Sequence, residues 1–139
     1  MEILIVAMTD SIHTVRWVKQ LVGAPLSIRL FSAYPDASIH PSMPNIGVCS
    51  PLFTESQRTG RAGRILSSLL RKVRSRLHRA LPWLHSFLLL VVIRFFRPDI
   101  VHSLETQGAG YLCLEVKKRL KNRFPIWIHT NWGSDIYLF

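Results

Sequence analysis

The sequence has few acidic residues, few cysteines and no long uncharged apolar run. Its 139 residues include 8 Asp and Glu and 2 Cys, and no 20-residue window is both apolar and free of charge. An ordinary membrane-spanning helix, which needs about 20 such residues, is therefore not expected. The two cysteines lie far apart and match no metal or redox spacing, which excludes zinc ribbons and disulfide-stapled miniproteins and favours reduced thiols in the cytoplasm.

Apolar residues are plentiful enough for a globular core. They make up 48% of the chain, and charged residues make up 19%, which argues against wholesale disorder. A chain of this length predicts a single domain over residues 1–139, or an incomplete part of one.

Segments typical of strands and helices alternate along the chain. The apolar run at 2–8, which is rich in β-branched residues, predicts a strand buried on both faces, and apolar residues at helical spacing predict helices. The expected strands are 2–8, 26–31, 46–49, 100–104 and 125–130, and the expected helices are 12–22, 61–80, 83–96 and one that opens at Gln107 or Gly108. This order predicts an α/β fold: a Rossmann-like open parallel sheet with helices on both faces.

The positive charge is concentrated in one segment. The formal net charge is +10, and residues 55–97 hold ten basic residues against one acid. Residues 58–97 predict a basic amphipathic helical segment, for which three interpretations are open: a solvated face, a nucleic-acid patch and a helix lying on an anionic bilayer.

Aromatic and aliphatic residues beside the arginines favour the membrane, and no nucleic acid is expected as a partner. The membrane-binding candidates are the basic and aromatic residues of this segment, Arg64, Arg71, Lys72, Arg74, Arg76, Arg79, Trp83 and Phe87.

Ligands of open parallel sheets bind beyond the carboxyl ends of the strands, and polar residues gather in the loops expected there. His13 and Thr14 start a helix, His102 lies within a strand, and Glu105 follows that strand. Each also has a structural interpretation. Ser11 or Asp10 could cap the helix and leave His13 exposed, and His102 could be a structural histidine whose hydrogen bonds are made within the fold. The sequence shows no catalytic triad, carboxylate pair or metal-ligand cluster, so no metal is expected.

The terminal turn offers a further candidate. Trp132 presents an indole and Asp135 a carboxylate, a combination that suits a sugar through ring stacking and hydrogen bonds to hydroxyls. Packing of Trp132 under the sheet edge and helix capping by Asp135 are equally open.

Three segments resemble family 4 glycosyltransferases, which are retaining enzymes of GT-B architecture. Residues 11–18 resemble their first loop and helix, and Arg97–Glu105 resembles their Pro-Asp-Val-Val-His-x-His segment. Thr130–Tyr137 resembles their Thr-x-His-Gly-Ser-Asp turn. Two positions differ from the family pattern: Leu104 stands where many members have a second histidine, and Trp132 where many have histidine.

The resemblance implies the amino-terminal, acceptor-side domain of a two-domain enzyme. The domain that binds the nucleotide-sugar donor lies outside this sequence, so no cofactor is expected on this chain and no catalytic residue is assigned. The resemblance places acceptor-side roles at His13, Thr14, Arg16, Glu105, Gln107 and Asp135. His102, which matches the more structural histidine of the family motif, and Trp132 complete the set of substrate-binding candidates.

We therefore expect the acceptor-binding half of a retaining glycosyltransferase. The complete enzyme would transfer a sugar from a nucleotide sugar to a glycan or lipid-linked acceptor at the cytoplasmic face of the membrane, with the donor domain supplied elsewhere, and the chain alone would be inactive. The alternative is a non-enzymatic α/β module that docks on anionic membranes or on a partner protein.

Overall fold

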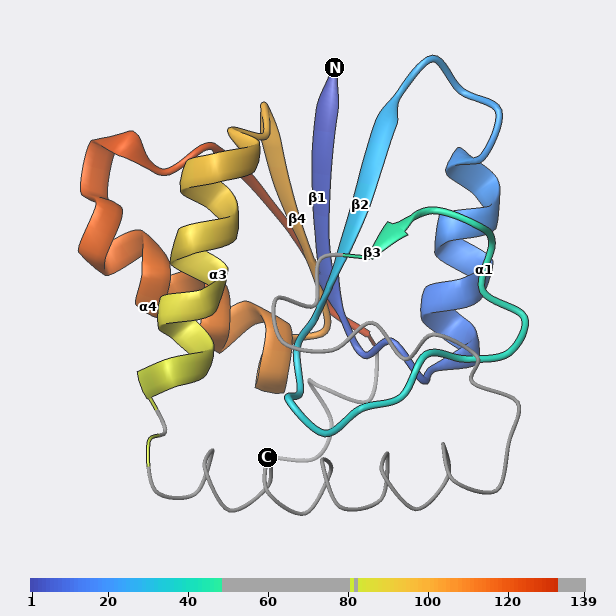
Figure 1. Cartoon of the computed structure of the whole chain (residues 1–139), viewed down its shortest axis with the longest axis horizontal. Helices are drawn as coiled ribbons and strands as arrows, with labels where there is room; N and C mark the ends of the chain where they lie inside the picture. Colours follow the sequence, from blue (N-terminus) through green and yellow to red (C-terminus); the bar gives the residue numbers. More distant parts are fainter. Residues whose placement is uncertain (49–80, 82, 133–139) are drawn as a thin grey trace, which may run out of the picture.

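The computed structural model describes residues 1–48, 81 and 83–132 of the chain. Within them, five strands form one parallel sheet in the order β3-β2-β1-β4-β5 (Figure 1). The strands are β1 (Glu2–Ala7), β2 (Ser27–Ser32), β3 (Gly47–Val48), β4 (Ile100–Leu104) and β5 (Ile126–Thr130). The predicted parallel α/β sheet is thus confirmed. The expected helix 61–80 lies outside the described residues, as do Cys49 and Asp135.

Helices cover both faces of the sheet, as the sequence predicts. Helix α1 (Ile12–Leu21) packs on one face, and α3 (Trp83–Phe96) and α4 (Tyr111–Leu120) lie side by side on the other (Figure 1). The chain enters α4 through one π-helical turn, η1 (Thr106–Gly110), and leaves it through a 3₁₀ turn, η2 (Lys121–Arg123).

The central strand β1 is apolar because it is buried on both sides. Ile3 and Ile5 face α1 and pack with Val18, whereas Leu4 and Val6 face α3 and α4 and pack with Leu89. Side chains alternate between the faces of a strand, so one continuous apolar run supplies both cores.

Strands β1 and β4 are far apart in the sequence but adjacent in the sheet, and a polar contact at their first residues joins them in addition to the strand pairing. The backbone N–H of Glu2 donates to Asp99 Oδ2 at 2.8 Å, and the N–H of Asp99 donates to the carbonyl of Glu2 at 2.9 Å. These two bonds fix the start of β4 beside the start of β1, so that both strands end at the same edge of the sheet.

Candidate functional site at the carboxyl end of the sheet

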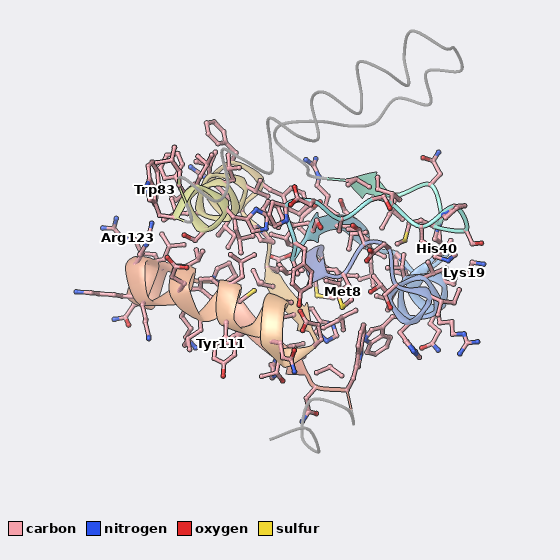
Figure 2. All side chains as sticks on the ribbon, turned by 90° about the horizontal axis from the view of Figure 1, so that it is seen from below. Met8, Lys19, His40, Trp83, Tyr111 and Arg123 are labelled. Carbon is pink, nitrogen blue, oxygen red and sulfur yellow. The ribbon has the colours of Figure 1, made fainter. Side chains whose placement is uncertain are left out.

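The carboxyl ends of β1, β2, β4 and β5 converge at one edge of the sheet. Figure 2 looks onto this edge, with Met8 at the end of β1 lying between α1 on one side and α3 and α4 on the other. The described substrate-binding candidates lie in strand β4, in the first turns of α1, and in the segments that follow β4 and β5. In open parallel sheets, ligands bind at this edge.

Glu105 directly follows β4 and organises the loop that leads to α4. Its side chain is only 3% exposed, and its carboxylate accepts hydrogen bonds from the N–H groups of Gly108 and Ala109. The Glu105 backbone has φ 77° and ψ 149°, a region that residues with a side chain rarely adopt and that concentrates at functional sites. The carboxylate is thus directed to the amides of its own loop.

Gly108 brings the loop after β4 against the loop after β2. A Cβ at this position would lie 2.6 Å from Glu105 Oε1 and 2.6 Å from Cζ and Oη of Tyr34. Such distances are well inside van der Waals contact, so a side chain at residue 108 would force the Glu105 or Tyr34 side chain to move. Glycine therefore lets these two side chains lie against the backbone of the loop beside the carboxyl edge.

His102 and Thr130 join β4 to β5 on the α1 side of the sheet. His102 Nε2 and Thr130 Oγ1 are 2.9 Å apart, and the His102 ring meets Trp17 of α1 edge to face at 5.4 Å between centroids. Burial, and secondarily the neighbouring His129, lower the pKa of His102 from its usual value of 6.5. His102 is consequently a neutral, hydrogen-bonded side chain at neutral pH.

His129 makes an equivalent connection on the opposite side of the same strands. His129 Nδ1 lies 2.9 Å from Ser103 Oγ, and His129 Nε2 lies 3.1 Å from Thr106 Oγ1. Ser103 Oγ also accepts a hydrogen bond of 2.9 Å from Trp127 Nε1. This network reaches Thr106, the first residue of η1, at the edge of the sheet.

His13 and Trp132 come together across the carboxyl edge from opposite ends of the chain. Their ring centroids are 5.4 Å apart, with an angle of 51° between the planes. Ser11 caps α1 by accepting the N–H of His13 at 3.2 Å, which fixes the backbone that carries the imidazole. Two residues that the sequence singled out separately thus form one contact.

The other candidates lie in contrasting environments. Arg16 and Gln107 are exposed. Thr14 is completely buried, and its Oγ1 has no hydrogen-bond partner among the described residues. Asp135 and the six basic membrane candidates, Arg64, Arg71, Lys72, Arg74, Arg76 and Arg79, lie outside the described residues. The structure therefore brings His13 and Trp132 together, and leaves Thr14 and Arg16 on different sides of α1.

The two aromatic membrane candidates lie on α3. Trp83 is 50% exposed and Phe87 is 43% exposed, and their rings meet edge to face at 6.1 Å between centroids. None of the helices in the described ranges is long and apolar enough to cross a bilayer. The same ranges hold no group of three or more His, Cys, Asp or Glu side chains that fits a metal ion.

Four residues at this edge are absent from the sequence-based candidate set: Ser103, Thr106, His129 and Tyr34. A histidine one residue before the end of the last strand is a visible signal. The partners of this histidine cannot be identified from the sequence, because the pairing of Ser103 with His129 depends on the register of β4 with β5.

A Rossmann-like parallel sheet with polar loops at its carboxyl edge defines the class of protein: an α/β domain with an open parallel sheet, a fold in which ligands bind at that edge. Comparison with known families places it further. The model of the family described as "Glycosyl transferase 4-like" matches residues 2–139, and the chain belongs to this family. No curated protein and no solved structure matches the chain. Glycosyl transfer is therefore the general reaction class of this domain.

Proposed function

We propose that this chain is the acceptor-binding half of a retaining glycosyltransferase that moves a sugar from a nucleotide sugar to a glycan or lipid-linked acceptor. Family membership supports glycosyl transfer in general. The observation that carries the acceptor-binding role is the His13–Trp132 ring contact at the edge where open parallel sheets bind ligands. The nucleotide sugar is a substrate of the complete enzyme.

The chemistry of this contact suits a saccharide. An indole face packs against the apolar face of a sugar ring, and polar tips nearby satisfy its hydroxyl groups. The exposed side chains of His13, Arg16 and Gln107 supply hydrogen-bond donors and acceptors of the kind that hydroxyl groups need. A partly exposed Trp132 held by His13 is thus a preformed platform.

A saccharide-binding assay tests the acceptor role. The probes are the methyl glycosides of glucose, galactose, mannose and N-acetylglucosamine, with binding followed by saturation-transfer NMR. Trp132→Ala should reduce the affinity for a bound glycoside about tenfold, if stacking contributes about 1–1.5 kcal/mol as aromatic contacts do. Trp83→Ala removes an exposed indole of α3 and should leave the affinity unchanged. Equal affinity in wild type and Trp132→Ala would contradict the proposal.

Transfer itself requires the donor and the acceptor to be held together, because orientation supplies a large part of the reduction in the barrier. We propose that the isolated chain is inactive for this reason. The assay incubates the chain with UDP-glucose or GDP-mannose and the glycoside that it binds, and product is sought by mass spectrometry. Transfer by the chain alone would contradict this part of the proposal.

We further propose that the protein binds peripherally at the cytoplasmic face of an anionic membrane. The exposed rings of Trp83 and Phe87 and the basic residues of segment 58–97 support it. Aromatic rings insert at the interface, and each basic residue near an anionic surface contributes about 1 kcal/mol.

Vesicle flotation separates the membrane role from the acceptor role. The chain should float with phosphatidylglycerol vesicles and not with phosphatidylcholine vesicles, and the double variant Trp83→Ala/Phe87→Ala should float less. Trp132→Ala is the matched control here and should float like wild type. Flotation without binding of any glycoside probe would favour the alternative, a non-enzymatic module that docks on anionic membranes.

A further inference from the structure

We propose that α3 is the element of this protein that enters the membrane. It lies flat in the surface of an anionic bilayer and contacts the lipid through an outer stripe of four residues, Trp83, Phe87, Val91 and Phe95. This inference rests on the membrane binding proposed above. It adds a second anchor, Phe95, at the far end of the helix, and it defines which face of the domain is turned to the lipid.

The outer stripe is apolar along the whole helix. Its members recur every four residues, a spacing that places side chains on the same side of a helix. Trp83 is 50% exposed, Phe87 43% and Phe95 87%, and Val91 is partly exposed. Among the described residues, Phe95 is the large apolar side chain with the highest exposed fraction.

The opposite side of α3 packs in the core, so the helix has two apolar sides. Ser86, Leu89 and Ile93 are buried, and Leu89 and Ile93 belong to the core on this face of the sheet. A helix that is apolar all round is typical of complete burial in a protein or of a membrane environment. The exposed fractions of the outer stripe show that the described elements leave this second side uncovered.

The length of α3 decides how it can meet a bilayer. Its 14 residues extend about 21 Å, which is short of the roughly 30 Å hydrocarbon core that a spanning helix must cross. The buried side chains of Leu89 and Ile93 also hold α3 against the sheet. A short helix fixed in this way can enter only the interface, where the apolar side of a helix sinks about 5–10 Å below the headgroups.

The charges at the end of α3 favour an anionic bilayer as the partner. Arg94 and Arg97 are exposed there, and the Arg29 guanidinium lies 4.1 Å from the centre of the Phe96 ring. None of these three arginines forms an ion pair with another described residue, and residues 83–97 contain no acid. A second copy would bring further positive charge to this surface, whereas anionic headgroups complement it.

Glu115 of α4 does not oppose this positive charge, although it contacts α3. Its Oε1 accepts a hydrogen bond of 2.9 Å from Ser86 Oγ and pairs with Arg119 Nη2 at 2.8 Å. The carboxylate is therefore compensated within the helix that carries it.

Contact through the outer stripe also defines the orientation of the domain. Helices α3 and α4 lie on one face of the sheet and α1 on the other (Figure 1). With α3 on the lipid, α1 and the His13–Trp132 contact are on the side turned to water. Ile126, which lies opposite Ile100 on the α1 face, is then an exposed apolar side chain that stays away from the lipid.

Spin labels test this orientation directly. In a Cys49→Ser background, in which Cys113 is buried, the label is attached to Phe87→Cys, Phe95→Cys or Ile126→Cys. On phosphatidylglycerol vesicles, the labels at 87 and 95 should be accessible to oxygen and protected from a water-soluble nickel chelate. The label at 126, where the native side chain is 68% exposed, should stay accessible to the chelate. Exposure of the label at 95 to the chelate would overturn the proposal.

Flotation with the same vesicles measures the contribution of each side chain. Phe95→Ala should weaken binding about tenfold, the effect of exposing an aromatic side chain that is otherwise buried in lipid. Arg94→Gln should weaken it about fivefold, since one basic charge near the anionic surface is lost. Ile126→Ala is the matched control and should bind like wild type. Urea unfolding of each variant checks that the fold is retained.

The remaining outcomes separate this inference from the proposed function. Wild-type binding by Phe95→Ala, together with weaker binding by Trp83→Ala/Phe87→Ala, would overturn the flat contact and leave membrane binding through the first turns of α3. Absence of flotation by the wild type would overturn the membrane role and this inference with it. A wild-type dimer in sedimentation that Phe95→Ala dissociates, with no change in flotation, would assign the outer stripe to a second copy instead.

Discussion

Both carboxylate oxygens of Glu105 lie 2.9 Å from the backbone nitrogen of Gly108, three residues further along the chain. The carboxylate therefore accepts hydrogen bonds from the backbone amides just before α4. Backbone amides at the start of a helix are a common binding site for anions. The loop between β4 and α4 is closed by its own side chain, so its shape is defined before any ligand arrives.

Replacing this carboxylate should destabilise the protein. Glu105→Gln keeps the shape of the side chain, but it replaces one accepting oxygen with an NH₂ group that faces the backbone N–H donors of Gly108 or Ala109. We therefore expect urea denaturation to show a loss of about 1–3 kcal/mol in the free energy of unfolding. Asp36→Asn, an exposed carboxylate in the loop after β2, is the control and should change stability by less than about 0.5 kcal/mol. Equal effects of the two substitutions would mean that the Glu105 bonds contribute nothing specific.

A methyl group at residue 108 should also be poorly tolerated. The added Cβ would meet Glu105 Oε1 and the Tyr34 ring at 2.6 Å, so Gly108→Ala should cost about 1–3 kcal/mol through overpacking. In Gly47→Ala, the new Cβ would meet Arg29 Cγ at an ordinary 3.4 Å, and thermal unfolding should show little change. A Gly108→Ala protein as stable as wild type would show that the two loops do not pack this closely.

The stability of the fold should depend on the protonation of His102. Its pKa in the folded state is lowered from 6.5, mainly by burial, so the unfolded chain takes up a proton more readily than the folded one. Stability is then full above the unfolded-state pKa and decreases as the pH falls below about 6.5. Urea unfolding at pH 7.5 and 5.5 should show this loss, and His102→Gln should reduce it. A His102 NMR titration with its midpoint at or above 6.5 would contradict the prediction.

The Cys113 thiol should be inert in the folded protein. Burial raises its pKa to about 12, and the side chain is fully inaccessible, so the reactive thiolate is scarce and shielded. In a Cys49→Ser variant, a thiol reagent such as DTNB should not react at pH 8 and should titrate one thiol after denaturation in urea. Rapid reaction of the native variant would mean that this part of the core opens readily.

The sheet could be predicted from the sequence because its strands are distinctive. The continuous apolar run at 3–8 indicates a strand covered on both faces, and the strand pattern at 100–104, separated from it by helical patterns, indicates a further parallel strand. The structure places β1 and β4 at these positions. The turn η1 was not predicted, since a helix was expected to open at Gln107 or Gly108. The local sequence does not reveal that the Glu105 carboxylate holds the amides of that turn.

The site was less predictable than the fold, because side-chain partners depend on register and on contacts between distant segments. His13 and Trp132 were each proposed from local motifs, but their contact across 119 positions required the structure. Glu105 is a substrate-binding candidate from the sequence, whereas in the structure its carboxylate accepts hydrogen bonds from the amides of Gly108 and Ala109. The substrate role of each candidate stays a prediction.

The bonds that join Glu2 to Asp99 have a consequence for synthesis on the ribosome. Strand β1 can pair with β2 early, but its second neighbour in the sheet is translated 97 positions later, about 5–20 s at usual elongation rates. During that interval one edge of the most apolar strand has no partner from its own chain. A nascent chain in this state is a natural client for chaperones that shield unpaired strands, and slower translation before residue 99 would prolong its exposure.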